Sequence, residues 1–396
     1  MTTRTRHWRA ILPLAPAPFL LAADEGAPVP DAPAPAPDEQ ASFRTDGGGD
    51  DSLPWFALVP GAFPPPGSAH HIAGELIGLD HVEREFVLRA DRTDRQNRSH
   101  FDLPLAAAML PYGSVVQHGA PAALRDIPLG THLHGAFYLE DPDAPSEPVA
   151  TFQGRTTPEA AFNRCFRLED DFSYRSRRSE LWEINSLDTA ARKLTATLHT
   201  AAGPAGEPEA FDLMDGTRVW EGDRVTAPDH LQPGQHILFN LTWATLYGPG
   251  RITEIWADDE ARSLAQAHQF AKHHQHVRER GLPGWIDAVD NAEHTLTITF
   301  FGNVDLALFD ALDEGHRVAV VVAKESLATY DPVNDRQYGQ LLEMGDAPPE
   351  PGSAGIRVRV KSDLLLEGFR PGRIVRIYTN NWPLVDIPSE EQFFGR

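Results

Sequence analysis

Histidines are the side chains of this sequence best suited to chemistry, and they gather in two places. Neutral imidazole nitrogen binds Zn and Cu well, and an exported protein can capture either metal. In residues 268–276, His273 and His276 are three positions apart and would share one face of a helix, whereas His268 would lie far around it. This segment predicts either a metal site on a helix or a structural or solvated helix surface.

His132 and His134 form the second group. Side chains two residues apart on a strand point to the same side, so this pair can chelate one ion. His118 is a further candidate ligand, and the missing one would come from His100 or from a carboxylate on a neighbouring strand. The alternative is a set of histidines on a barrel surface. Zn or Cu is the possible cofactor, and the sequence identifies no other.

Tryptophan side chains could instead build a platform for sugars or peptides. Trp220 and Trp243 are the candidate ligand-binding residues. Packing in the core is the alternative, above all for Trp182 and Trp285, which lie where predicted units join. The tryptophans at or near strand ends are Trp182, Trp220, Trp243, Trp256, Trp285 and Trp382.

Patterns that would support catalysis are missing from the sequence. It contains no Gly-X-Ser-X-Gly elbow, no His-Glu-X-X-His motif and no glycine-rich phosphate loop after a strand. The single cysteine, Cys165, is predicted to be a small buried hydrophobe rather than a reactive thiol. Asp331, Asn334 and Asp335 lack the spacing of an EF-hand and predict a turn rather than a Ca site. A protein without enzymatic activity is favoured.

Acidic residues dominate the charge of the chain. The 57 Asp and Glu residues outnumber the 35 Lys and Arg residues, which gives a formal net charge of −22 at pH 7. Such a charge repels phosphate backbones, and the basic stretch at residues 175–178 is too short to reverse it. Nucleic acid is therefore not an expected partner.

The amino-terminal residues have the features of an export signal. Three arginines precede an apolar stretch over residues 10–21, and Ala22 and Ala23 offer a cleavage site, so residues 1–23 predict a signal peptide. Residues 24–66 are rich in Pro, Ala and Gly and predict a disordered spacer. No later apolar run approaches the roughly 20 residues that a membrane-spanning helix needs. The protein is expected in the periplasm, at the cell surface or outside the cell.

An internal repeat defines the elements that would carry the candidate side chains. Three segments align without gaps: residues 76–88, 184–196 and 286–298. An Asp is aligned in all three, at Asp80, Asp188 and Asp290, with apolar residues four before and one before it. A basic residue or His lies four after the Asp, and apolar residues lie six and eight after it. The pattern predicts a strand, a turn built on the Asp side chain, and a second strand with one buried face.

Two further elements recur with the Asp turn. Gly130, Gly234 and Gly372 each precede an alternating strand and predict a tight turn. Residues 168–171 of the first copy match residues 256–259 of the second. The three Asp turns lie 108 and 102 residues apart, which makes each copy large enough for a small barrel.

A helix is expected between the second and third copies. Asp258 or Asp259 can cap its start, and Gly281 and Pro283 end it. Its apolar face is predicted to contain Leu264, Ala267, Ala271, His274 and Val277. The third copy also carries a predicted extra hairpin over residues 315–322 and 330–339.

These features predict an all-β-dominated fold of three tandem small β-barrels and one connecting α-helix. With 396 residues, 41% of them hydrophobic, and with 34 Pro and 31 Gly, the chain suits several turn-rich β domains. The expected boundaries are 67–171 for the first barrel, 172–259 for the second, 260–282 for the helical connector and 283–396 for the third barrel.

The three copies resemble the OB-like small barrels of uncharacterised exported bacterial proteins, through the Asp turn of the first hairpin and the Gly-led strand. The resemblance implies a ligand-binding or scaffolding role and no catalysis, since OB-like barrels often bind oligonucleotides or oligosaccharides on one face. We therefore expect an exported, non-enzymatic binding or scaffolding protein, with a cell-envelope protein or glycan as partner. The alternatives are a His-dependent metal-binding protein or metalloenzyme, and an array of carbohydrate-binding modules for the cell wall.

Overall fold

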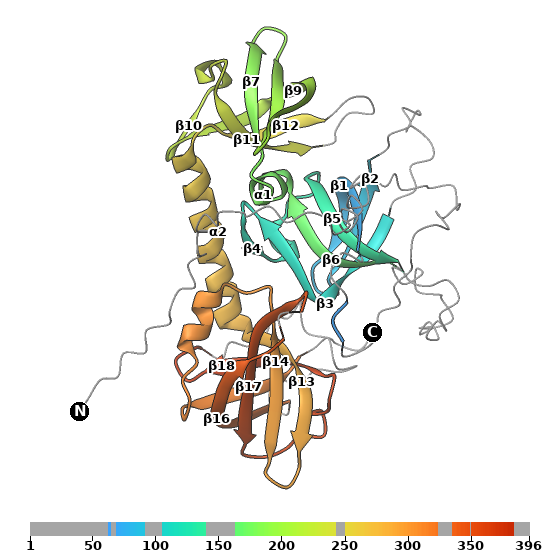
Figure 1. Ribbon diagram of the computed structural model, residues 1–396, viewed down its shortest axis with the longest axis vertical. Coiled ribbons are helices and arrows are strands. Elements are labelled where there is room, and N and C mark those ends of the chain that lie inside the picture. The colour runs from blue at the N-terminus through green and yellow to red at the C-terminus, as the bar shows by residue number, and fades with distance from the viewer. Residues whose placement is uncertain are drawn as a thin grey trace, which may run out of the picture. The chain divides into compact units, whose positions relative to one another are not determined.

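The fold is dominated by β-strands in three sheets, as the sequence predicts (Figure 1). The computed structural model describes residues 62–64, 69–91, 105–139, 163–242, 250–323, 335–348 and 350–383. All of them belong to one compact unit. The predicted signal peptide over 1–23 and all of the spacer over 24–66 except residues 62–64 lie outside the described residues.

The first sheet forms a ring of five strands. Its strands are β1 (His70–Asp80), β2 (Glu85–Ala90), β3 (Leu105–Gln117), β5 (His132–Leu139) and β6 (Asn163–Asp170). The order is β2-β1-β5-β6-β3, and a pairing of β2 with β3 closes the ring. Only β3 and β6 pair in parallel among these neighbours. The short strand β4 (Ala120–Ala122) extends from β3, and the 3-10 helix η1 (Leu124–Asp126) leads to β5.

The second sheet repeats this arrangement strand for strand. Its ring strands are β7 (Leu181–Asp188), β8 (Lys193–Thr200), β9 (Gly203–Glu221), β11 (His236–Thr242) and β12 (Arg251–Trp256). A pairing of β8 with β9 closes the ring, and β9 and β12 are parallel. The short strand β10 (Arg224–Thr226) and η2 (Pro228–His230) occupy the places of β4 and η1. The two sheets are therefore copies of one topology.

The third sheet is a closed barrel with an added hairpin. Its strands are β13 (Leu282–Asp290), β14 (Thr295–Phe301), β15 (Arg317–Val322), β16 (Arg336–Asp346), β17 (Ser353–Ser362) and β18 (Ile374–Thr379), with η3 (Leu306–Ala311) after β14. The ring runs β13-β14-β17-β16-β15-β18, and every pairing is antiparallel. The pair β15–β16 is the hairpin that distinguishes this copy.

The Asp of each repeat lies in the same turn in all three barrels. Asp80 Oδ1 accepts hydrogen bonds from the backbone N–H groups two and three residues later, at 2.9 and 3.0 Å. Asp290 Oδ1 makes the same two bonds, at 2.9 and 3.1 Å. Asp188 Oδ1 accepts from the backbone N–H three residues later, at 2.8 Å. The residue four after each Asp has a left-handed backbone, with φ of 58° at Arg84, 52° at Arg192 and 54° at His294. A turn followed by one left-handed residue is a common way to close a β-hairpin.

The recurring glycines form a second turn that is hydrogen-bonded to the first strand of each barrel. Gly130, Gly234 and Gly372 have φ values of 88°, 84° and 80°, which favour glycine. Each donates its N–H at 2.7 Å to a carbonyl of that strand, and the acceptors are Leu76, Ile184 and Ile286. The first strand of each barrel is therefore held at the residue that starts the repeat.

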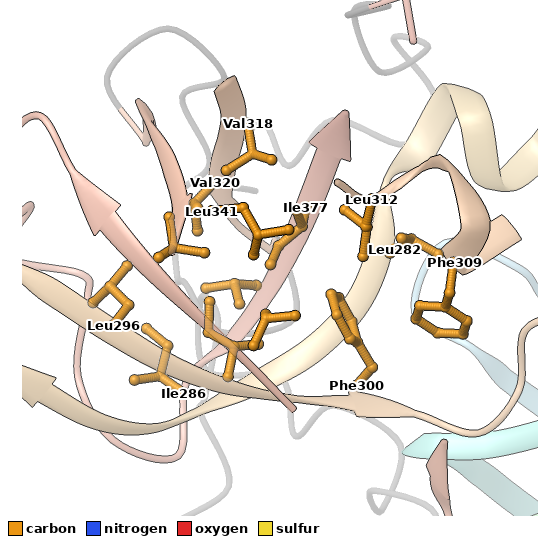
Figure 2. Close-up of a cluster of buried hydrophobic side chains, with 14 of the residues drawn as sticks. Leu282, Ile286, Leu296, Phe300, Phe309, Leu312, Val318, Val320, Leu341 and Ile377 are labelled. Atoms are coloured by element: carbon orange, nitrogen blue, oxygen red, sulfur yellow. The ribbon is translucent and has the colours of Figure 1, made fainter. Parts of the chain in front are cut away.

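Apolar side chains fill the barrel interiors. Figure 2 shows this for the third barrel, where Ile286, Leu296, Val320, Leu341 and Ile377 converge from different strands. The first and second barrels have equivalent clusters, and Trp182 stacks on Phe239 within the second. The interiors are packed cores.

Two α-helices follow the matching Asp-Asp segments. Asp258 caps α2 (Asp259–Arg280) by accepting the N–H of Ala261 at 2.7 Å, and Asp170 caps α1 (Asp171–Arg177) by accepting the N–H of Ser173 at 2.9 Å. The sequence does not predict α1, because seven residues are too few to establish helical periodicity. Among the described residues, no helix is long and apolar enough to cross a membrane.

The predicted apolar face of α2 is right for Val277, which is buried, and wrong for Ala267 and Ala271, which are exposed. Gln269 and His273, which the prediction left out, are buried. The reason is a polar contact, because Gln269 donates to the carbonyl of Pro121 at 3.1 Å and so turns this side of the helix toward β4.

Replacing Leu296 by Ala should lower the free energy of unfolding of the third barrel by about 3 kcal/mol, because a cavity remains where a fully buried side chain was. Leu364→Ala is the matched control, since Leu364 is 55% exposed and its truncation should cost less than about 0.5 kcal/mol. Urea unfolding measures both variants. Equal losses would contradict the assignment of the core.

Candidate functional site

Strand β5 places His132 and His134 side by side outside the barrel core. Leu133 between them points into the core, so the alternation of the strand sends both imidazoles to the opposite side. They are nevertheless buried, at 6% and 8% exposure, because α1 packs over this part of β5. The pair that the sequence singled out is thus a buried pair.

Asp171, the first residue of α1, joins the two histidines. Its Oδ1 lies 2.7 Å from His132 Nδ1 and 2.9 Å from His134 Nε2. Its Oδ2 accepts the backbone N–H of Leu241 on β11 at 2.9 Å. One buried carboxylate therefore binds side chains of the first barrel and the backbone of the second.

A second carboxylate reaches the far side of His132. Asp91 Oδ2 lies 2.9 Å from His132 Nε2, so both ring nitrogens face a carboxylate. Burial favours the neutral ring, but the charges of Asp171 and Asp91 outweigh it and raise the pKa of His132 well above its ordinary value. His132 is consequently an imidazolium that donates to both acids.

His134, unlike His132, is neutral. It stacks on Tyr174 of α1, with ring centroids 3.8 Å apart, and burial lowers the pKa of His134 to about 4. The neutral ring donates from Nε2 to Asp171, so Nδ1 is the unprotonated nitrogen. That Nδ1 is buried and has no hydrogen-bond partner among the residues that the structure describes. The two neighbouring histidines thus differ in charge because they face different numbers of carboxylates.

These three side chains form a group that can hold a metal ion. One ligand atom from each of His132, His134 and Asp171 lies within 4.8 Å of the others. Two imidazoles and a carboxylate form a donor set typical of Zn and other divalent transition metals. Asp91 would then be the outer carboxylate that orients a metal-bound imidazole. The carboxylate in this group comes from the start of a helix rather than from a strand.

The other histidine proposed as a ligand on sequence grounds lies apart from this group. His118 Nε2 is 3.8 Å from Asp170, the neighbour of Asp171. His100 lies outside the described residues.

The structure does not bring His273 and His276 to a common ligand. His273 Nε2 accepts the backbone N–H of Asp305 at 3.2 Å, and His276 Nδ1 accepts from the guanidinium of Arg125 at 2.7 Å. Burial and neighbouring positive charge lower their pKa values to about 4 and about 3. Neither belongs to a group of three metal-binding side chains within the described part of the chain.

A second three-residue group was not anticipated from the sequence. Glu183, His199 and His236 meet on the outer face of the second barrel, with His199 Nε2 2.6 Å from Glu183 Oε2. The register aligns Glu183 with His236 across β7 and β11, and His199 projects from β8. Spacing alone could not reveal this group, because its members come from three strands.

Of the two candidate ligand-binding tryptophans, the structure describes Trp220 only. Trp220 is half-buried, packs near Phe172 and Trp256, and donates to Glu254 at 3.2 Å. Trp243 lies outside the described residues. The remaining tryptophans of that set are buried: Trp182, Trp256, Trp285 and Trp382.

Three further expectations concern the Ca-like turn, the lone thiol and the basic stretch. Asp331 and Asn334 lie outside the described residues. Cys165 is fully buried, and burial raises the pKa of its thiol, as for an unreactive cysteine. The basic stretch pairs with acids, since Arg177 binds Glu169 at 2.9 Å and Arg175 binds Glu180 at 2.7 Å.

Comparison of the chain with protein-family models, with curated proteins and with solved structures finds no match.

In metal-free protein, His132→Gln should be more destabilising at pH 6 than at pH 9.5. The folded pKa of His132 lies above the unfolded value of about 6.5, so the charged ring stabilises the fold fully below that pH and loses its effect as pH rises through the folded pKa. We expect a loss of about 3 kcal/mol at pH 6, measured by urea unfolding with a chelator present.

His268→Gln is the control for this measurement, because His268 is exposed and should show the same small effect at both values of pH. A His132→Gln loss that stays constant or grows at high pH would show that the ring is neutral in the fold.

Proposed function

We propose that the chain is an exported, non-enzymatic binding or scaffolding protein whose tandem barrels act as one body. The order of ring strands in the first two barrels supports an OB-like assignment, because each is a five-stranded Greek-key ring with one parallel pair. Packed apolar interiors leave the outer faces and the joints between barrels as the places for a ligand or partner. A cell-envelope protein or glycan fits the predicted location outside the cytoplasm.

The observation that carries this proposal is the buried polar joint between the first and second barrels. Asn240 of β11 donates to Asp170 Oδ2 at 2.9 Å and accepts the N–H of Phe172 at 2.8 Å. Nearby, Thr242 donates to the carbonyl of Gly130 at 2.6 Å. Asp170 and Asn240 are almost completely buried, and each would lose a hydrogen bond if the barrels separated. The joint favours one fixed arrangement over independent modules.

Helix α2 makes equivalent contacts to the first and third barrels. Gln266 donates to the carbonyl of Gly119 at 2.9 Å and Gln269 to that of Pro121 at 3.1 Å. At the other end of the helix, Tyr378 of β18 donates to the carbonyl of Glu279 at 3.2 Å. Together with the Asn240 joint, these contacts link all three barrels and so support a scaffolding role.

Asn240→Ala tests whether the barrels form one body. It should lower the free energy of unfolding by about 1–3 kcal/mol, because a buried carboxylate and a backbone N–H each lose a partner. It should also separate the unfolding of the first two barrels, which tryptophan fluorescence and hydrogen exchange can follow. Asn291→Ala is the control, since Asn291 is exposed in the β13–β14 turn. Independent unfolding of the barrels in the unaltered protein would contradict the proposal.

A second candidate function is metal binding at the group formed by His132, His134 and Asp171. The favouring observation is the outer carboxylate of Asp91, 2.9 Å from His132 Nε2, which is the arrangement that orients metal-bound imidazoles in many metal sites. A divalent cation would replace the proton on His132 Nδ1 and the one on His134 Nε2.

Chelator-treated protein should therefore bind one equivalent of Zn or Cu and release protons as it does so, which calorimetry in buffers of different ionisation enthalpy measures. His134→Ala should abolish this binding, whereas His273→Ala should leave it intact. His199→Ala in all samples removes the surface group as a competing site. Metal binding that survives His134→Ala would rule out this centre.

A further inference from the structure

Three side chains that can ligate a metal converge on the outer face of the second barrel. They are Glu183 of β7, His199 of β8 and His236 of β11. In the sheet, β7 lies between β8 and β11, so the three strands are direct neighbours. The group therefore stands on paired strands rather than on loops, which fixes the positions of its members closely.

The strand register explains why these side chains meet. Glu183 lies opposite His236 in the antiparallel pair of β7 and β11. The partner of Glu183 on β8 lies two residues before His199, so His199 is a diagonal neighbour on the same face. Trp182 and Ile184, on either side of Glu183, belong to the barrel core. Strand alternation therefore directs the carboxylate away from the core.

Both imidazoles direct Nε2 toward the same carboxylate oxygen. His199 Nε2 lies 2.6 Å and His236 Nε2 lies 3.9 Å from Glu183 Oε2. The two rings are nearly perpendicular, at 87°, with centroids 5.1 Å apart. Tetrahedral Zn bonds of about 2.0–2.1 Å separate ligand atoms by about 3.3 Å. The observed separations lie on both sides of that value, so small side-chain rotations would bring all three ligand atoms to one ion.

The surroundings leave the group open to a dissolved cation. The side chains of Glu183, His199 and His236 are 31%, 25% and 45% exposed. Among the described residues, the ion pairs of Glu183 are those with the two histidines. Arg262 donates to the backbone carbonyl of His236 at 3.4 Å, and its charge is paired with Asp259. An ion can therefore reach the ligands without any opening of the fold.

A purely structural role does not account well for this group. Ion pairs at this exposure contribute little to stability, because water screens them. The apolar core of the second barrel lies on the other side of the sheet. Replacing one of the three side chains should therefore leave the barrel folded, so a loss of metal binding would reflect the loss of a ligand.

We propose that Glu183, His199 and His236 bind a divalent transition-metal ion, for which Zn²⁺ is the best match, and leave a fourth coordination position open to solvent. Two imidazoles and one carboxylate form a donor set of open zinc sites, whereas Ca²⁺ and Mg²⁺ prefer oxygen ligands. The ion takes the place of the proton between His199 Nε2 and Glu183 Oε2, and that proton passes to solvent. The inference goes beyond the scaffolding role and shares no residue with the buried histidine group.

Zinc titration of the chelator-treated full chain carrying His134→Ala tests the proposal, because that change removes a ligand of the buried group. Calorimetry should show one equivalent of Zn²⁺ bound, and no binding of Ca²⁺ at the same concentration. Adding His236→Ala should weaken zinc binding at least about tenfold. His230→Ala is the matched control and should leave the affinity unchanged. His230 is a histidine of the same barrel, 58% exposed and 3.8 Å from Glu221.

A measurement on the unaltered protein covers the case in which His134→Ala does not fold. Zinc should shift the NMR signals of the His199 and His236 imidazole nitrogens over the same range of concentration and leave those of His230 in place. Unmoved His199 and His236 signals at saturating zinc would overturn the proposal.

Two further results of the titration would also overturn it: zinc affinity unchanged by His236→Ala, or an equal loss in the His230→Ala control. Neither result bears on the Asn240 joint, whose failure would instead appear as independent unfolding of the barrels. Failure of the buried group would appear separately, as binding that is insensitive to His134→Ala when His199 is already replaced.

Discussion

Two adjacent buried carboxylates, Asp170 and Asp171, are the constraint on which the arrangement of the first two barrels depends. Removing a carboxylate from water costs several kcal/mol unless charge and hydrogen bonds compensate for it. Here the compensation comes from both barrels: the imidazoles of β5 and the Leu241 N–H satisfy Asp171, while Asn240 and the start of α1 satisfy Asp170. Neither barrel alone offers all of these partners, so burial of the acids links the two folds.

The sequence predicts the repeated parts of the fold because local chemistry determines them. An Asp that accepts the next backbone N–H groups makes its turn with no help from distant residues, and a glycine with positive φ marks a tight turn in the same way. Asp80, Asp188 and Asp290 therefore identify three barrels from spacing alone. The pair His132 and His134 was visible for a similar reason, since strand alternation places them on one side.

The remaining features depend on tertiary contacts that spacing does not encode. The third member of the histidine group is Asp171, 37 residues from His134, and it lies at a helix of only seven residues. The buried side of α2 includes Gln269, which bonds to β4, so a count of apolar residues identifies Val277 but also selects the exposed Ala267 and Ala271.

Native-state hydrogen exchange in Asp171→Ala tests the central claim most directly, because this change removes the carboxylate that serves both barrels. We expect amides of β5 in the first barrel and of β11 in the second, including Leu241, to lose protection together. Loss of protection confined to the first barrel, with β11 unchanged, would contradict it.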